Sequence, residues 1–239
     1  MNLLLLSEET LDSNGNFQVT GKHAEHIFCI LHAIPGNLLK IGFISGKIGK
    51  AEVLESTKKY ATLHLLNADT PPPAPSNITP LIALPRPQSF KKTLHFIASS
   101  GIREAFFFHG SKTEKSYWTS SVLSPDSIKK YLLEGMEQGA TTIVPEISFI
   151  KSQKELISSG ILENLTRDKL PLLAHPNQAK PCPSNYRGNV SLVIGPEGGL
   201  TEEELTIFES HGFQRITCTP HILRVEFALA FFAGRLAYY

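Results

Sequence analysis

The sequence is poor in the residues that crosslink a protein or anchor it in a membrane. Its 239 residues include only three cysteines, Cys29, Cys182 and Cys218, and no C-x-x-C pair. This odd, widely spaced set implies no disulfide framework and suits free thiols in a reducing compartment. No apolar run approaches the roughly 20 residues that span a membrane, and the start, MNLLLLSEETL, has no basic flank for a signal peptide. We therefore expect a cytoplasmic globular protein.

An excess of charge of either sign is also lacking. The formal net charge is +1, so a surface for nucleic acid must be a local patch within a balanced total. Hydrophobic residues make up 41% of the chain, which is enough for a large core or for one large and one small core.

One proline-rich segment, Asp69–Pro80, divides the chain, because its sequence DTPPPAPSNITP suits neither a helix nor a central strand. Before this linker (69–80), short alternating runs separated by turns predict a small β-barrel over residues 1–68, with one helix near Gly21–Ala33. After it, strands alternate with helices through residues 81–239. That order predicts an α/β domain whose parallel sheet is covered by helices.

Ligands of parallel sheets bind beyond the carboxyl ends of the strands. Three such ends are prominent here: Ala174–Pro176, Gly195–Gly199 and Cys218–His221. We expect the functional site in these loops.

The second of these loops lies in the segment VSLVIGPEGGLTEEEL, residues 190–205. A buried strand enters a turn whose glycines expose backbone N–H groups. Thr201 and Glu204 then form a capping box, and Leu200 and Leu205 are spaced as a hydrophobic staple. The glycines either tighten this turn or let a ligand approach the backbone. Because Glu202 to Glu204 already occupy the positive end of the helix, the pattern favours a neutral or cationic ligand over a phosphate.

An ordered set of motifs resembles the RsmE family of the SPOUT superfamily. The set comprises MNLLLL, G-x-x-G-x-A-x-V at residues 46–53, ALPRP at 83–87, EKSYW at 114–118, GMEQG at 135–139, AHP at 174–176, IGPEGG, and ILRVE at the start of the last helix. The resemblance implies a PUA-like β-barrel RNA-binding domain and a SPOUT methyltransferase domain with a C-terminal trefoil knot. It also implies a homodimer.

The family transfers a methyl group from S-adenosylmethionine to N3 of a uridine in 16S (small-subunit) rRNA. By the family pattern, the cofactor-binding residues are Ala174, His175, Gly195, Pro196, Glu197, Gly198, Gly199, Thr219, His221, Ile222 and Leu223. A sulfonium cofactor carries a positive charge and no phosphate, which agrees with the acidic helix start. For His175, an ordinary strand-end role is the alternative.

The catalytic candidates are Arg224, for stabilising uracil oxygens, and Glu226, for orienting Arg224 or accepting a proton. The alternative is that both are ordinary polar residues at the start of a helix, with no catalytic role. The target uridine must be unpaired, so aromatic and cationic RNA contacts are expected. The candidates for these contacts are Arg86, Lys112, Lys115, Tyr117, Trp118, Lys47 and Lys50.

Several positions depart from the family pattern. Cys218, Thr219 and His221 stand where the family has leucine, glycine and arginine, Phe227 replaces a threonine, and His23 and His32 replace arginines. These departures keep two alternatives open: a catalytically weakened, ribosome-associated RNA-binding paralogue, or a methyltransferase for another RNA. His23, His26, Cys29 and His32 also recur every three residues, but that step is shorter than a helical turn, so we expect no metal site.

Overall fold

The computed structural model describes residues 2–7 and 10–237, and the chain forms two compact units. One unit holds Met1–Ala74 together with Leu133–Val144, and the other holds Pro75–Leu132 and Pro145–Tyr239. The change of unit near Pro75 falls inside the proline-rich segment. No composition shift marks residues 133–144, so sequence patterns do not reveal that they belong with the first unit.

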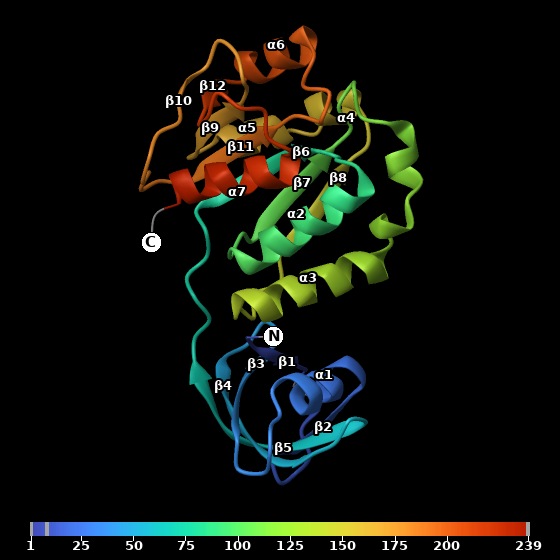
Figure 1. Ribbon diagram of the computed structural model, residues 1–239. Helices are drawn as coiled ribbons and strands as arrows, with labels where there is room; N and C mark the ends of the chain where they lie inside the picture. The colour runs from blue at the N-terminus through green and yellow to red at the C-terminus, as the bar shows by residue number, and fades with distance from the viewer. Residues whose placement is uncertain (1, 8–9, 238–239) are drawn as a thin grey trace. The chain divides into compact units, whose positions relative to one another are not determined.

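The first unit is built on a curled five-stranded sheet in the order β1-β3-β4-β5-β2 (Figure 1). Its strands are β1 (Leu4–Leu6), β2 (Asn16–Thr20), β3 (Leu38–Phe43), β4 (Ile48–Ser56) and β5 (Tyr60–Thr70). β1 pairs with β3 in parallel, and the other pairs are antiparallel. Alternate residues of β2, β4 and β5 point into a core that includes Phe17, Val53 and Leu63. The alternation in the sequence therefore predicts these strands correctly.

The predicted helix of this unit is shorter and less regular than expected. α1 (Gly21–Glu25) continues as a π-helical segment, η2 (His26–Ile30), rather than as an α-helix to Ala33. His32 then adopts a left-handed conformation with φ 47°, which ends the helical segment.

The second unit contains a seven-stranded sheet in the order β10-β12-β9-β11-β6-β7-β8, with every neighbouring pair parallel. The strands are β6 (Ile78–Ala83), β7 (Glu104–Phe108), β8 (Glu146–Ile150), β9 (Leu170–Ala174), β10 (Lys180–Pro181), β11 (Val190–Ile194) and β12 (Gln214–Thr217). The helical elements are α2 (Pro87–Ser99), η3 (Lys115–Thr119), η4 (Ser121–Leu123), α3 (Pro125–Gly139), α4 (Gln153–Ser158), α5 (Ile161–Thr166), α6 (Glu202–Ser210) and α7 (Val225–Leu236). α3 contributes residues to both units. The predicted α/β class with a parallel sheet is confirmed.

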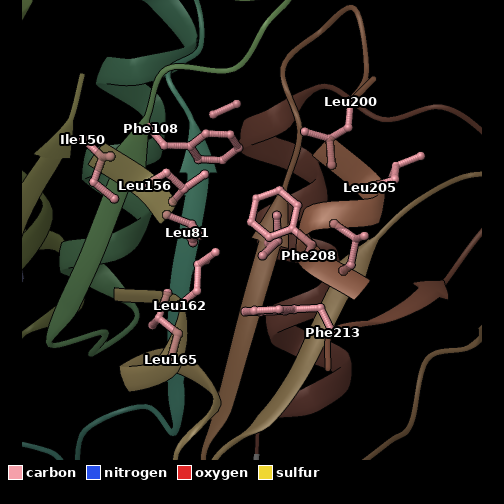
Figure 2. Close-up of a cluster of buried hydrophobic side chains, with 13 residues drawn as sticks. Leu81, Phe108, Ile150, Leu156, Leu162, Leu165, Leu200, Leu205, Phe208 and Phe213 are labelled. Atoms are coloured by element: carbon pink, nitrogen blue, oxygen red, sulfur yellow. The ribbon is translucent and has the colours of Figure 1, made fainter. Parts of the chain in front are cut away.

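Helices cover both faces of this sheet. On one face, side chains of α4, α5 and α6 pack on the sheet around Leu81, Phe108 and Phe208 (Figure 2). On the other face, Phe90 of α2 packs edge to face against Phe107 of β7, with ring centroids 4.9 Å apart. The buried strands are apolar on both faces, as expected for a parallel sheet covered on both sides.

Two boundaries differ from the sequence prediction. The linker is shorter than 69–80, because β5 extends to Thr70 and Pro80 lies inside β6. The sheet tolerates this proline because β6 pairs with β7 only from Leu81 onward, so Pro80 precedes the stretch that is paired on both sides. The alternating pattern also does not show that α4 and α5 are separate helices, which they are because Gly160 adopts φ 72° between them.

None of the helices within the described residues is long and apolar enough to cross a membrane. In the same part of the chain, no group of three or more His, Cys, Asp or Glu side chains is arranged to hold a metal ion. Tyr238 and Tyr239, at the end of the sequence, lie outside the described residues.

Candidate functional site

The three loops singled out in the sequence leave the sheet at one edge. Ala174, the last residue of β9, is in register with Ile194 of β11 and with Ile216 of β12. The chain that follows each of these strands therefore emerges side by side with the other two. The expected meeting of these loops is a consequence of strand order and register.

The loops and the start of α7 enclose a cavity of about 290 Å³. Its wall contains all eleven residues predicted to bind a cofactor: Ala174, His175, Gly195, Pro196, Glu197, Gly198, Gly199, Thr219, His221, Ile222 and Leu223. The rest of the wall was not among the predicted cofactor-binding residues and consists of Pro176, Ile194, Leu200, Thr217, Cys218, Val225, Ala228 and Phe232. The small residues of the last helix were the available signal for Ala228.

The glycine-rich loop is held by its own packing. A side chain at Gly195 would come within 2.9 Å of Leu200 Cγ, and Gly199 adopts φ 72°. The predicted capping box is present: Thr201 Oγ1 accepts from Glu204 N–H at 3.3 Å, and Glu204 Oε2 accepts from Thr201 N–H at 2.8 Å. The other carboxylate oxygen of Glu204 accepts from Ser111 N–H at 2.7 Å, so this buried side chain also ties the loop after β7 to α6.

Two oxygen atoms of the glycine-rich loop accept hydrogen bonds from residues outside it. The Glu197 carboxylate accepts a hydrogen bond from Arg86 N–H at 3.2 Å, and Lys112 Nζ donates to the carbonyl oxygen of Gly198 at 3.0 Å. Two residues predicted to contact RNA thus border the cavity through contacts with its loop. The carboxylate supplies negative charge beside an otherwise largely apolar wall.

His175 interacts with its own loop. Its Nδ1 lies 2.8 Å from the carbonyl oxygen and 3.3 Å from the N–H of Asn177. The ring therefore fixes the turn at the end of β9, while the residue also lines the cavity.

The two catalytic candidates occupy different surroundings. Arg224 is the exposed N-cap residue of α7, directly after the segment that lines the cavity. Glu226 is buried, its carboxylate lies 3.7 Å from Lys92 Nζ of α2, and neither of its oxygens has a hydrogen-bond partner within the described residues. Lys92 is a neighbour of Glu226 that sequence spacing did not predict.

Trp118, one of the two aromatic candidates, lies beside a second cavity of about 330 Å³ beyond β7 and β8, which is lined by His109, Lys115, Trp118 and Lys151. Trp118 Nε1 donates to His109 Nδ1 at 2.8 Å, which fixes the indole ring. Burial and a hydrogen bond to Glu114 raise the pKa of Tyr117 above its ordinary value. His109 and Lys151 were missed, although both directly follow a strand end. Lys47 and Lys50 belong to the first unit.

His23, one of the departures from the family pattern, forms an ion pair in the first unit. Its Nε2 lies 2.8 Å from Glu137 Oε1. This hydrogen bond raises the pKa of His23 above its ordinary value, against the opposing effect of burial.

The comparisons with known proteins agree with this site. The family model described as RNA methyltransferase domain matches residues 72–237, more than half of the chain, and the chain belongs to this family. Its predicted membership in the RsmE family is also confirmed. The chain is 27% identical over 229 residues to Ribosomal RNA small subunit methyltransferase E 1 of Borreliella burgdorferi, covering 95% of this chain and 94% of that protein. It is 29% identical over 206 residues to Ribosomal RNA small subunit methyltransferase E of Treponema pallidum, covering 85% and 77%.

The fold has a counterpart among solved structures. The crystal structure of a Ribosomal RNA small subunit methyltransferase E from Neisseria gonorrhoeae, bound to S-adenosyl methionine, aligns with a TM-score of 0.72 at 21% identity, covering 98% of this chain and 96% of that chain. At this identity, the likeness shows that the two chains share a fold.

Proposed function

We propose that the protein is an S-adenosylmethionine-dependent methyltransferase that modifies N3 of a uridine in 16S (small-subunit) rRNA. One observation carries the proposal: three strand-end loops, predicted separately from the sequence, form a single cavity in a chain of the RNA methyltransferase family. The names of the Borreliella and Treponema relatives support small-subunit rRNA as the substrate class.

The residues around the cavity fit this cofactor. Apolar walls, including Ile222, Leu223 and Phe232, suit an adenine ring, and the small residues of the Gly195–Gly199 loop allow close backbone contact. The Glu197 carboxylate and the acidic start of α6 suit a sulfonium better than a phosphate. When bound, the cofactor supplies an electrophilic methyl carbon.

In the proposed reaction, uracil N3 loses its proton and forms a bond to that methyl carbon as the carbon–sulfur bond breaks. Negative charge develops on the uracil oxygens when N3 is deprotonated. Arg224 is exposed and lies in the chain between Leu223 and Val225 of the cavity wall, where its guanidinium is proposed to stabilise this charge. Glu226 is paired with Lys92, and we propose that this pair holds α7 and therefore Arg224 in position.

RNA binding is proposed to use the aromatic and cationic residues near the cavity. Trp118, fixed by His109, offers a stacking face for an unpaired base, with Lys115 and Lys151 beside it for phosphates. Arg86 and Lys112 contact the Gly195–Gly199 loop and would bind RNA beside the cofactor. Lys47 and Lys50 would provide the contribution of the first unit.

The finer features of the fold remain part of the proposal. The first unit would be a PUA-like domain, and the segment after β12 would thread a trefoil knot. Phe227 and Phe231, about half exposed on one face of α7, suit a homodimer interface. The rRNA substrate would place the activity in the cytoplasm.

Calorimetry with S-adenosylmethionine tests the proposal. We expect micromolar binding to the wild type and a loss of at least about tenfold in Gly199→Val, because valine is strained at positive φ. Gly212→Val is the matched control: Gly212 also has positive φ with open space around it but lies after α6, outside the cavity wall. The control should lose stability and keep its affinity. Absence of binding at millimolar cofactor would favour the RNA-binding paralogue instead.

A further inference from the structure

Two of the three cysteines are neighbours on adjacent strands, although 36 positions separate Cys182 and Cys218 in the sequence. In the parallel pair of β10 and β12, Lys180 faces Ile216 and Pro181 faces Thr217. Each cysteine is the next residue along its strand. The pairing continues through them, because Cys182 N–H donates to the carbonyl oxygen of Thr217 at 2.9 Å.

This register brings the two thiols together. Directly opposed residues of neighbouring strands lie about 4.8 Å apart, which is inside the Cα separation of about 4.4–6.8 Å that disulfides span. The Cys182 thiol donates to the carbonyl oxygen of Pro183 at 3.3 Å, and the two thiols are close enough to shift each other's pKa. The strand register therefore already gives the backbone separation of a disulfide.

The two thiols differ in exposure. Cys182 is buried, whereas Cys218 is half-buried and lines the cavity between the strand-end loops. A small oxidant that enters the cavity therefore meets Cys218 first. Arg235 of α7 is the charged group that acts on both thiols, and its positive charge favours their thiolate forms.

We propose that Cys182 and Cys218 form a dithiol site that a peroxide converts to an intramolecular disulfide, and that this disulfide weakens cofactor binding. The first half rests on the strand register alone. The second half rests on the function proposed above, because Cys218 begins the segment that forms one wall of the cofactor cavity.

The reaction balances with hydrogen peroxide as the oxidant. The Cys218 thiolate attacks one peroxide oxygen, the O–O bond breaks, and Cys218 becomes a sulfenic acid as hydroxide leaves. The Cys182 thiolate then attacks the Cys218 sulfur, the S–S bond forms, and the second oxygen leaves as hydroxide. Two thiols are oxidised, the peroxide is reduced, and the two hydroxides take up the two thiol protons to give water.

The disulfide would change the cavity wall. The S–S bond would tie Cys218, where the cavity-lining segment begins, to Cys182 after β10. Cys218 and the following Thr219 could then no longer adjust their positions to accommodate a cofactor. A bound cofactor should in turn cover Cys218. If the disulfide lowers the affinity for the cofactor, a bound cofactor must disfavour disulfide formation by the same factor.

Burial raises the pKa of Cys182 to about 12, and it also raises the pKa of Cys218, despite the opposing effects of the Cys182 thiol and of Arg235. Both thiols should therefore react slowly near neutral pH. Because only the thiolate attacks, disulfide formation should accelerate as pH rises from 7 to 9.

Intact-mass spectrometry and peptide mapping after peroxide treatment test the disulfide. We expect a monomeric product that has lost two hydrogen atoms, a linked Cys182–Cys218 peptide pair, and reversal by dithiothreitol. Cys182→Ser should abolish this product, and Cys29→Ser, which changes the third cysteine, should retain it. A sulfinic acid at Cys218 without a disulfide, or a disulfide between two chains, would overturn the proposal.

Calorimetry with S-adenosylmethionine on reduced and oxidised protein tests the coupling. We expect at least about a tenfold weaker affinity after oxidation of the wild type, and recovery of the original affinity when dithiothreitol reduces the same sample. An unchanged affinity in the disulfide form overturns the coupling. If the reduced protein itself fails to bind, the proposed function fails while the mass result still decides the disulfide.

Discussion

At the scale of single residues, Arg224 and Glu226 differ in surroundings although only one position separates them. Arg224 is the exposed N-cap residue of α7, next to Leu223 and Val225 of the cavity wall, whereas Glu226 is buried beside Lys92 of α2. From the sequence alone, both residues are equally plausible catalytic candidates. Burial distinguishes them, and it leaves Arg224 as the side chain that can reach a substrate.

Arg224→Gln should therefore lower the methylation rate by about a hundredfold or more, the usual cost of removing a donor to a developing oxyanion. Affinity for S-adenosylmethionine should change little, because the charge acts on the uracil. Single-turnover methyl transfer to small-subunit rRNA measures the rate. Arg103→Gln is the control, since Arg103 precedes β7 at the opposite ends of the strands. A variant at Arg224 that reacts like this control would contradict the assignment.

The His23–Glu137 pair predicts a pH dependence of stability. Folding raises the pKa of His23, so the pair's contribution is fully present below about pH 6.5, the unfolded value, and is lost as pH rises through the folded pKa. The side chain is 40% exposed, which limits the contribution to no more than about 1 kcal/mol.

Urea unfolding at pH 6 and pH 8 measures this effect. The wild type should lose more stability between the two values than His23→Gln, and Glu137→Gln should show the same reduced loss as His23→Gln. Equal losses in all three proteins would show that the pair contributes nothing to the pH dependence.

At the scale of helices and strands, the sequence predicted those elements whose formation depends on their own residues. The alternation of β4 and the capping box of α6 are present as expected. The sequence did not predict β10, because its two residues gain strand geometry only by pairing with β12. The same pairing brings Cys182 to Cys218, a neighbour that no local pattern indicates. Pro80 was wrongly assigned to the linker for a related reason. Strand β6 can contain this proline because its pairing with β7 begins only at Leu81.

The capping box of α6 gives a prediction for this element. Thr201→Ala should lower the free energy of unfolding by about 1 kcal/mol, because Glu204 N–H loses its side-chain acceptor. Thr206→Ala is the matched control within the same helix, since its hydroxyl only bonds back to the Glu202 carbonyl. Chemical denaturation measures both. Equal destabilisation by the two variants would contradict a special role for the cap.

At the scale of the whole molecule, the candidate site is a product of topology. Strand order places the ends of β9, β11 and β12 together, and the sequence predicted this meeting because parallel sheets gather their carboxyl ends at one edge. Physical reasoning from sequence could not extend to the proposed knot, because knots are nearly absent among folds. Nor does any sequence pattern show that residues 133–144 belong with the first unit.

The proposed homodimer is tested by the exposed face of α7. Changing Phe227 and Phe231 together to serine should shift the protein from dimer to monomer in light scattering, because both rings are about half exposed in the single chain. Ile157→Ser is the control: Ile157 is similarly exposed, but on α4, which covers the other face of the sheet. A wild type that is already monomeric at micromolar concentration would contradict the interface.

Primer extension on 16S rRNA tests the central claim most directly, because a methyl group on uracil N3 blocks base pairing and stops reverse transcriptase. Small subunits that lack the modification are incubated with the protein and S-adenosylmethionine, with Arg224→Gln as the inactive control. We predict a new stop at a single uridine that requires both the wild-type protein and the cofactor. An extension pattern identical with and without the cofactor would contradict the account.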